Sequence, residues 1–166
     1  MPRASGRLDV HLCAAPPDRA VDAGPLQALA IASGWWAQDG SPGPAAAALL
    51  PGGFRAVSVV RHARAALVAN HQGGFRVRCP SCGASVVAAF QAAYAAWRDQ
   101  GRVEPVRCDA CGAVAALEAL DFQPAAAFTR LEVVLQDAGS IQPDPAALAE
   151  LTACAGPFRV VGRRVG

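Results

Sequence analysis

Two short cysteine motifs have the residue types and spacing of a metal site. Both have the form CxxCG, with CPSCG at residues 79–83 and CDACG at residues 108–112, and 25 residues separate the two cysteine pairs. Zinc bound by four thiolates is tetrahedral, and one tight CxxC turn supplies two of the four sulfurs. We therefore expect a single structural Zn²⁺. Its ligands would be Cys79, Cys82, Cys108 and Cys111.

The segment between the motifs has a helical pattern. Val86, Phe90, Tyr94 and Trp97 recur at helical spacing. We predict a helix over residues 85–100, with Ser85 as its N-cap and a glycine at position 101 closing its end.

Three alternatives stand against structural zinc: redox dithiols, a bare disulfide pair and a catalytic zinc. A redox dithiol is normally a single motif at the start of a helix, so two copies, each followed by glycine, fit that chemistry poorly. A catalytic zinc keeps one position open for water or substrate, and four cysteines would fill every position. The spacing favours a closed site that stabilises a segment too small to fold alone.

The segment 75–112 resembles a zinc ribbon of the rubredoxin-like kind. The resemblance implies Cys79, Cys82, Cys108 and Cys111 as the zinc ligands, and the expected helix between the motifs departs from the minimal ribbon. Zinc ribbons occur in nucleic-acid-binding, protein-interaction and enzyme accessory modules, so the resemblance implies metal binding without selecting one role.

Length, net charge, hydropathy and cysteine usage limit the class of protein and its cellular compartment. The chain has 166 residues and a formal net charge of +2, which indicates no strongly charged partner. No apolar run approaches the roughly 18 residues of a membrane span, and the first 24 residues lack the apolar core of a signal peptide. Paired CxxC motifs with two isolated cysteines are typical of a reducing compartment, so we expect a cytoplasmic protein with no membrane partner.

Alternation and capping residues predict the elements outside the cysteine segment. In the N-terminal part we expect a strand at 7–13, a helix at 25–37, a loop at 39–53 and a strand at 54–60. A further strand at 65–69 would turn through 70–74 and pair with 75–78, and residues 113–120 fit either a helix or a strand. Near the C-terminus we expect a strand at 129–136, a helix that Asp144 caps and Gly156 ends, and a strand at 158–163.

Without the cysteine segment, the predicted order is strand, helix, strand, then strand, helix, strand. This order is that of an α+β, ferredoxin-like (split βαβ) fold, in which two helices cover one face of a four-stranded antiparallel sheet. The expected organisation is a first half at residues 1–60, an inserted zinc-ribbon module at 61–123 and a second half at 124–166. The insertion lies between the second and third strands, where a longer connection costs little.

Other candidate residues have ordinary structural explanations. His11 and Cys13 share one face of the first strand and could form a second metal site or a nucleophile with its base. The sequence places no acidic or third ligand beside them, so we expect plain surface or interface residues. His62 and His71 are expected in loops near the zinc module, and Cys154 is expected on the buried stripe of the last helix.

The tryptophan pair and the aromatic face of the middle helix have similar explanations. If Trp35 and Trp36 lie on a helix they are about 100° apart, so we expect one to be buried and one to lie at the boundary of the core. The alternative is that one of them anchors an interface with a partner. Phe90, Tyr94 and Trp97 are expected to dock the zinc module on the rest of the protein.

The middle of the chain is basic, and this leaves two function classes. Residues 54–107 carry eight arginines against two acidic residues. The first class is a noncatalytic protein-interaction module with an unknown protein partner. The second is a nucleic-acid-associated protein, because a positive patch is typical of a nucleic-acid surface. The arginines assigned to that surface are Arg55, Arg61, Arg64, Arg76, Arg78 and Arg107. No hydrolase, phosphate-binding or dinucleotide motif indicates an enzyme.

Overall fold

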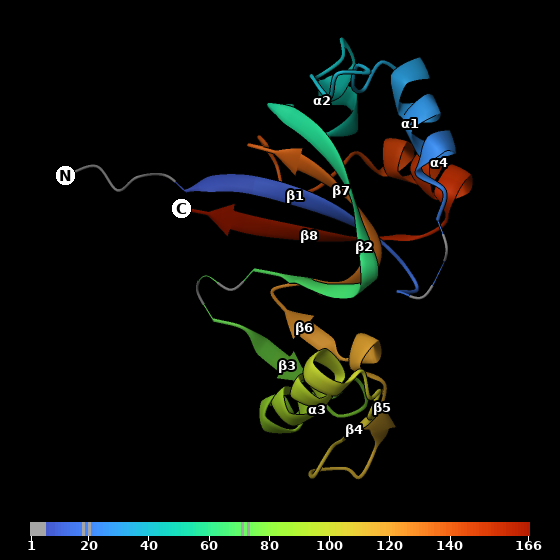
Figure 1. Ribbon diagram of the computed structural model, residues 1–166. Coiled ribbons are helices and arrows are strands. Elements are labelled where there is room, and N and C mark those ends of the chain that lie inside the picture. The colour runs from blue at the N-terminus through green and yellow to red at the C-terminus, as the bar shows by residue number, and fades with distance from the viewer. Residues whose placement is uncertain (1–5, 18, 20, 71, 73) are drawn as a thin grey trace, which may run out of the picture. The chain divides into compact units, whose positions relative to one another are not determined.

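The computed structural model describes residues 6–17, 19, 21–70, 72 and 74–166, and it divides into two compact units (Figure 1). The sheet unit comprises residues 1–72 together with 126–166, and the cysteine unit comprises residues 73–125. None of the helices in the described residues combines the length and hydropathy that a membrane span requires.

The sheet unit contains a four-stranded antiparallel sheet. Its strands are β1 (Arg7–Ala14), β2 (Ala56–Ala69), β7 (Ala126–Gln136) and β8 (Phe158–Val165), and their spatial order is β2-β7-β1-β8. The prediction of a mixed α+β protein with a four-stranded antiparallel sheet is therefore confirmed.

Helices α1 (Ala23–Ala32), α2 (Ala46–Leu49) and α4 (Pro145–Ala155) belong to the same unit. Asp144 caps α4 as predicted, because its carboxylate accepts hydrogen bonds from the amides of the second and third helical residues. Asp22 caps α1 by accepting from the Gly24 amide.

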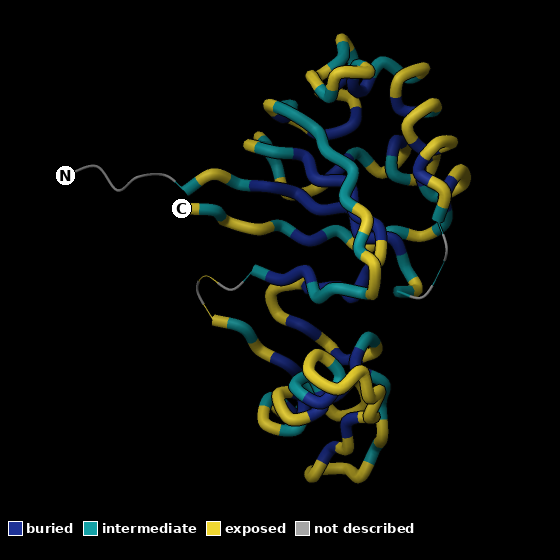
Figure 2. Tube along the Cα trace, viewed as in Figure 1, coloured by how far each residue is buried: buried dark blue, intermediate teal, exposed yellow. Residues whose placement is uncertain are grey.

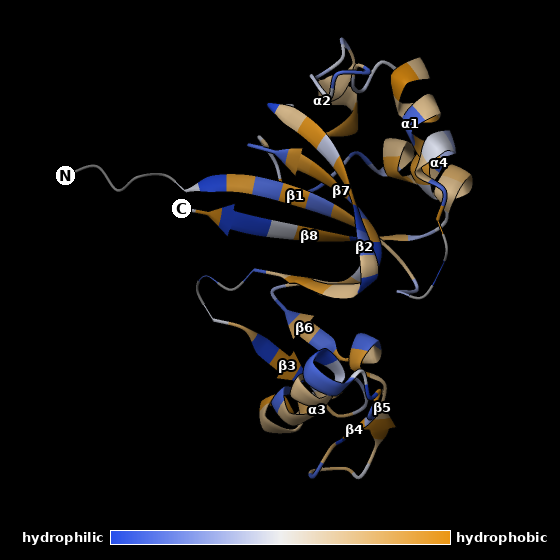
Figure 3. Cartoon of the chain, in the orientation of Figure 1, coloured by the Kyte–Doolittle hydropathy of each residue, from blue (hydrophilic) through white to orange (hydrophobic). Residues whose placement is uncertain are grey.

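The core of the sheet unit lies between these helices and one face of the sheet. Val10 and Leu12 of β1 and Val133 and Leu135 of β7 are fully buried in it. Figure 2 shows buried residues concentrated along the two central strands, and Figure 3 shows hydrophobic residues along β7 and hydrophilic ones at the end of β8. The opposite sheet face, called the open face below, carries the alternate residues of the strands.

The helix predicted at 25–37 ends at residue 32, and this changes the tryptophan pair. Gly34 has a φ of +70°, and it turns the chain out of the helix. Trp35 and Trp36 therefore do not lie on a helix, and both are buried, each 4% exposed, in the core. The expectation that one of them lies at the boundary is wrong.

The segment 39–53, predicted to be a loop, contains α2. Its Leu49 and Leu50 are fully buried in the main core. The segment was predicted to be a loop because glycine, proline and alanine dominate its composition. Composition alone does not indicate that its two leucines are buried.

One long strand replaces the two predicted at 54–60 and 65–69. β2 is continuous in its pairing with β7 except for a register shift between Arg61 and Ala66, which has the character of a β-bulge. Figure 1 shows β2 turning sharply about half-way along its length. The predicted hairpin between 65–69 and 75–78 is wrong, because β3 (Arg76–Arg78) pairs with β6 (Asp121–Gln123) instead.

The cysteine unit contains two small two-stranded sheets and one long helix. β3 pairs with β6, and β4 (Val106–Arg107) pairs with β5 (Val114–Ala115). Helix α3 (Val87–Gln100) lies between the two cysteine motifs in the sequence, and a short 3₁₀ helix, η1 (Leu117–Ala119), follows β5. Residues 113–120 are thus part strand and part 3₁₀ helix.

The ends of α3 confirm one predicted signal and correct the other. Gly101 has a φ of +67° and closes the helix, as expected. Ser85 does not cap it, because the helix starts at Val87 after an uncapped Val86. Ser85 instead forms a β-bridge with Arg78, which closes the turn of the first cysteine motif.

Candidate metal centre

The first cysteine motif forms a tight turn at the end of β3. The Cys79 amide donates to the Ala84 carbonyl at 2.8 Å, and the Gly83 amide donates back to the Cys79 carbonyl at 2.9 Å. Gly83 adopts a φ of +73°, a conformation in which glycine carries no steric cost. The Ser81 amide points at the Cys79 sulfur, with 3.4 Å between the nitrogen and Sγ.

The second motif repeats this turn between β4 and β5. The Cys108 amide donates to the Ala113 carbonyl and the Gly112 amide donates to the Cys108 carbonyl, both at 2.8 Å. Gly112 has a φ of +74°, almost the same as that of the first motif. We call these two turns the knuckles, residues 79–83 and 108–112.

The knuckles bring the four sulfurs together. The Sγ atoms of Cys79 and Cys111 are 3.8 Å apart, and those of Cys82 and Cys108 are 3.7 Å apart. All four Sγ atoms lie within 4.8 Å of one another. Four sulfurs at about 2.3 Å from one ion, placed at the corners of a tetrahedron, would be about 3.8 Å apart. A disulfide would require about 2.05 Å, so these cysteines are positioned for a shared metal ion and are not oxidised pairs.

No family model, curated protein or solved structure matches the chain. The arrangement of the four sulfurs is therefore the sole basis for assigning a candidate metal-binding site. Among the described residues, these four cysteines are the one group of three or more candidate ligands close enough to hold an ion.

The electrostatics of the site favour a cation among the sulfurs. Backbone amides of Ser81 and Cys82 donate to the Cys79 sulfur and lower its pKa to about 6. At Cys82 the Ala84 amide acts in the same direction, but the neighbouring thiols, Cys111 foremost, raise its pKa to about 12. The cluster therefore stabilises one thiolate readily and resists further negative charge. A divalent cation would remove that resistance, because its ligands must be thiolates.

A small apolar core holds the first knuckle and α3 in place. Phe90 of α3 packs edge-on against Phe122 of β6 with 5.5 Å between ring centroids, and Phe75 stacks on Phe122 at 5.5 Å. Val77 is the middle residue of β3, which ends directly before Cys79, and it is 1% exposed. Tyr94 and Trp97 continue the row of stacked rings along α3.

The six arginines of the proposed nucleic-acid surface fall equally into the two units. Arg55, Arg61 and Arg64 belong to the sheet unit, where Arg55 lies 3.9 Å from Asp137 and Arg61 lies 3.6 Å from Asp22. Arg76, Arg78 and Arg107 belong to the cysteine unit. The Arg78 guanidinium donates to the Gly83 carbonyl at 3.2 Å, so this side chain braces the first knuckle.

His11 and Cys13 are buried, which corrects the expectation that they are surface residues. His11 is 6% exposed and Cys13 is fully buried. Burial, followed by the negative charge of Glu132, raises the pKa of the Cys13 thiol, so this cysteine is not an activated nucleophile. His62 is also no loop residue, because it lies within β2.

Sequence reasoning missed the acidic partner of His11. Nδ1 of His11 lies 2.6 Å from one carboxylate oxygen of Glu132, and Nε2 of His62 lies 3.0 Å from the other. A signal was present, because Glu132 alternates with Leu131 and Val133 in the strand pattern, which assigns it to the same open face as His11. Only the pairing register shows that these strands are neighbours.

Two further expectations concern His71 and Cys154. His71 lies outside the described residues. Cys154 is exposed on α4, and Ala155 occupies the buried stripe in its place.

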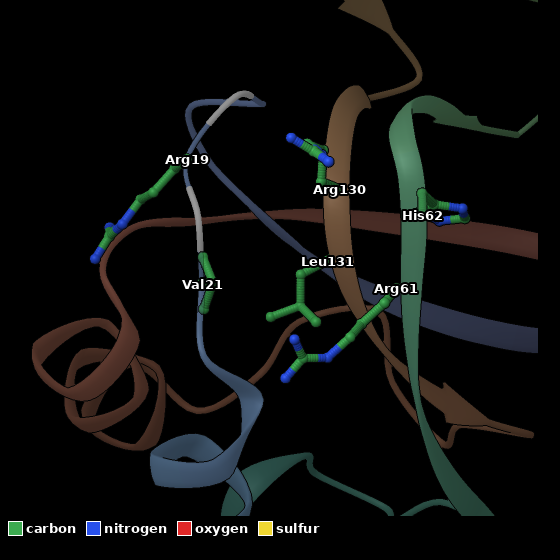
Figure 4. Close-up of a pocket in the computed structure, with 6 residues that line it drawn as sticks. All are labelled: Arg19, Val21, Arg61, His62, Arg130 and Leu131. Carbon is green, nitrogen blue, oxygen red and sulfur yellow. The ribbon is translucent and has the colours of Figure 1, made fainter.

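A pocket of about 230 Å³ opens beside the bend of β2 (Figure 4). Its lining includes Arg61 and Arg130, but Figure 4 shows that Arg61 reaches toward Val21 and Leu131 while His62 points away. The cationic groups do not converge on one point, so this pocket is no built anion site.

Proposed function

We propose that this protein binds one structural Zn²⁺ through Cys79, Cys82, Cys108 and Cys111 and serves as a noncatalytic protein-interaction module. The observation that carries the proposal is the spacing of the four sulfurs, which is that of a tetrahedral zinc–thiolate site. Four thiolates leave no position for water or substrate, which favours a structural ion over a catalytic one.

We further propose that the cysteine unit is a zinc ribbon inserted into a ferredoxin-like domain. The sheet order β2-β7-β1-β8, with α1 between β1 and β2 and α4 between β7 and β8, supports the split βαβ arrangement. The paired knuckles support the ribbon, and α3 would be an elaboration between them. The insertion would then occupy about residues 73–125, and it would start later than the 61–123 expected from the sequence, because residues 61–69 belong to β2.

A reducing, cytoplasmic location accords with the cysteines. All six are free thiols in the structure, including the two pairs whose sulfurs approach within 4 Å. Zinc sites of this kind need their thiols reduced, because only the thiolate binds the ion.

Metal analysis of the purified, reduced protein tests the proposal. We expect one zinc ion per chain by native mass spectrometry and elemental analysis, and we expect Co²⁺ substitution to give the absorption of tetrahedral thiolate coordination. Iron at one per chain would replace zinc as the resident ion, since a tetrahedral S₄ site also suits iron. Reduced protein that neither carries nor takes up any metal would refute the site.

Nucleic-acid binding through the six arginines remains the alternative, and the charge of the cysteine unit weighs against it. That unit has five arginines and five acidic residues, and a zinc ion with four thiolates would add a formal charge of −2. Phosphate contacts release counterions, so real binding to mixed nucleic acid would weaken steeply with salt. Absence of binding at low salt would remove this alternative.

A further inference from the structure

The open face of the sheet holds three linked polar side chains, of which the inner two are buried. His62 of β2, Glu132 of β7 and His11 of β1 are joined through the two carboxylate oxygens of Glu132, at 3.0 and 2.6 Å. The exposed fractions of their side chains are 26%, 9% and 8%, so the chain runs from the surface inward. Buried charge is costly unless it is paired, and Glu132 is paired on both oxygens.

The outer histidine lies where β2 changes direction. Pairing of β2 with β7 is regular up to Arg61 and resumes at Ala66, so His62 is the first residue of the irregular segment. The guanidinium of Arg130 donates to the Ala63 carbonyl at 2.8 Å within that segment. On β7, the Thr129 hydroxyl lies within hydrogen-bond distance of the Ala14 and Leu131 carbonyls and can donate its one proton to either, which marks an irregular point in this strand as well.

Beyond these two points, the strands form a short ribbon that covers the open face. We call it the distal ribbon, residues 66–69 of β2 paired with 126–129 of β7. Val68 and Ala127 of this ribbon pack on Cys13 of β1 and Val161 of β8. Among the described residues this cluster has four side chains, two of them small, so it buries little apolar area itself. Ala69, Ala126 and Phe128 of the ribbon are also buried.

We propose that the His62–Glu132–His11 chain is an acid-sensitive latch that holds the distal ribbon closed over the open face of the sheet. The carboxylate of Glu132 accepts from imidazoles on the two strands that flank β7. Once Glu132 takes up a proton it loses its charge and one of its accepting oxygens, and it no longer binds both histidines. His62 is then released at the point where β2 bends.

Asp9, another acidic group of the open face, has hydrogen-bond partners of its own, so Glu132 is the acidic group whose protonation we expect to release His62. Asp9 of β1 is held by two hydrogen bonds from Arg7, and the Asp137 amide also donates to it. Cys13 lies opposite Glu132 on β7 and opposite Arg159 on β8, and Asp9 lies opposite Arg163. The remaining direct neighbours of His11, Val134 and Val161, do not titrate. Nε2 of His11 is buried without a hydrogen-bond partner among the described residues, so Glu132 is its one anchor in them.

Opening would matter because the distal ribbon carries both connections to the cysteine unit. The polypeptide leaves the distal ribbon after residue 69, passes through the cysteine unit and returns to the ribbon at residue 126. An open ribbon would lengthen both connections and expose Cys13.

Hydrogen exchange of the full-length, metal-loaded protein tests the latch. We expect amides of residues 66–69 and 126–129 to exchange about tenfold faster, after correction for intrinsic rates, when the pH falls from about 7 to about 3. Amides of 57–60 and 133–135 should stay protected. His62→Ala should open the ribbon already at neutral pH. Arg64→Ala, an exposed residue of the same irregular segment, should behave like the wild type.

The outcomes separate the latch from ordinary acid unfolding. Loss of protection in the distal ribbon and the central strands at one common pH would overturn the proposal, and so would a wild-type profile for His62→Ala. If His62→Ala fails to fold, the exchange of wild-type protein across the same pH range still decides the question.

Acid also releases a thiolate-bound metal, and the distal ribbon carries both connections to the cysteine unit, so the same profile is measured on Cys82→Ser, which should lack the metal at every pH. Fast exchange of the distal ribbon in Cys82→Ser already at neutral pH would show that the metal, and not the latch, holds the ribbon.

Discussion

Cys82 and Cys154 are both exposed cysteines, and their surroundings assign them different roles. Cys82 lies in a knuckle, 3.7 Å from the sulfur of Cys108 and within 4.8 Å of two more. Cys154 lies on the outer side of α4, in the other unit. Comparing substitutions of Cys82 and Cys154 therefore separates the loss of a metal ligand from the general effect of replacing an exposed thiol.

Replacing Cys82 with serine should abolish stoichiometric zinc binding. A hydroxyl is a poor substitute for a thiolate, and structural zinc contributes several kcal/mol to the folding of small domains. Cys154→Ser should retain one zinc per chain, and so should Cys13→Ser, whose thiol is buried in the sheet unit. Zinc content and the thermal unfolding midpoint provide the measurement. Full zinc content in Cys82→Ser would show that this residue is not a ligand.

The contacts of Glu132 with two histidines determine how its protonation changes the stability of the fold with pH. Burial would raise its pKa, but the hydrogen bonds and charges of His11 and His62 outweigh burial and hold the pKa below the ordinary value of 4.5. A carboxyl whose pKa is lower in the folded state stabilises the fold above its unfolded pKa, and this contribution is lost as the pH falls through the folded value. Glu132→Gln should therefore be less stable at neutral pH and lose less stability between about pH 5 and pH 2 than wild type does. Denaturant titrations at several pH values measure this, and parallel curves for the two proteins would contradict it.

The knuckles are the smallest elements whose geometry the metal site needs. Gly83 and Gly53 both have φ near +70°, and a Cβ added at either would meet no other atom within 4 Å. They differ in position, because Gly83 closes the first knuckle and Gly53 lies in the sheet unit.

Gly83→Ala should weaken zinc binding, while Gly53→Ala should not. Each substitution forces an L-residue into a left-handed conformation, which costs about 1–2 kcal/mol. At Gly83 that cost falls on the closed knuckle, so we expect roughly a tenfold loss or more in zinc affinity, measured by competition with a chromophoric chelator. Equal zinc affinity in both variants would show that the knuckle tolerates the strain.

Local sequence signals predicted the elements that carry their own capping or alternation. The Asp144 cap, the glycine at the end of α3, the alternation in β1 and the two CxxCG turns all agree with the structure. Failures occurred where tertiary contacts decide. β3 takes β6 as its partner across more than 40 residues, and Leu49 and Leu50 anchor a segment whose composition is that of a loop.

The buried contact between His11 and Glu132 shows the same limit at the candidate sites. Its two residues are 121 positions apart, and only the pairing of β1 with β7 joins them. The clustering of the four cysteines could be predicted because each knuckle is encoded within five consecutive residues. The polar chain of the open face could not, because nothing local specifies which strands are neighbours.

At the scale of the whole molecule, the two units rest on different kinds of stabilisation. The sheet unit has a core whose buried residues include members of two strands, β1 and β7, and of three helices, with partly buried residues of β2 and β8 packed against it. The cysteine unit spans about 50 residues, a size at which hydrophobic burial alone is marginal and a metal or disulfide is usually needed. The proposed zinc ion should therefore be essential to one unit and dispensable for the other.

Removing the metal with a chelator under reducing conditions should unfold the cysteine unit selectively. Trp97 lies in that unit, while Trp35 and Trp36 are buried in the core of the sheet unit. Fluorescence of Trp97 should shift toward that of an exposed indole on chelation, and added Zn²⁺ should reverse the shift. In Trp97→Phe the shift should disappear, because the remaining tryptophans stay buried. Limited proteolysis should then cut first within residues 73–125 and leave the central strands intact. A single cooperative loss of both units on chelation would show that the metal stabilises the whole chain.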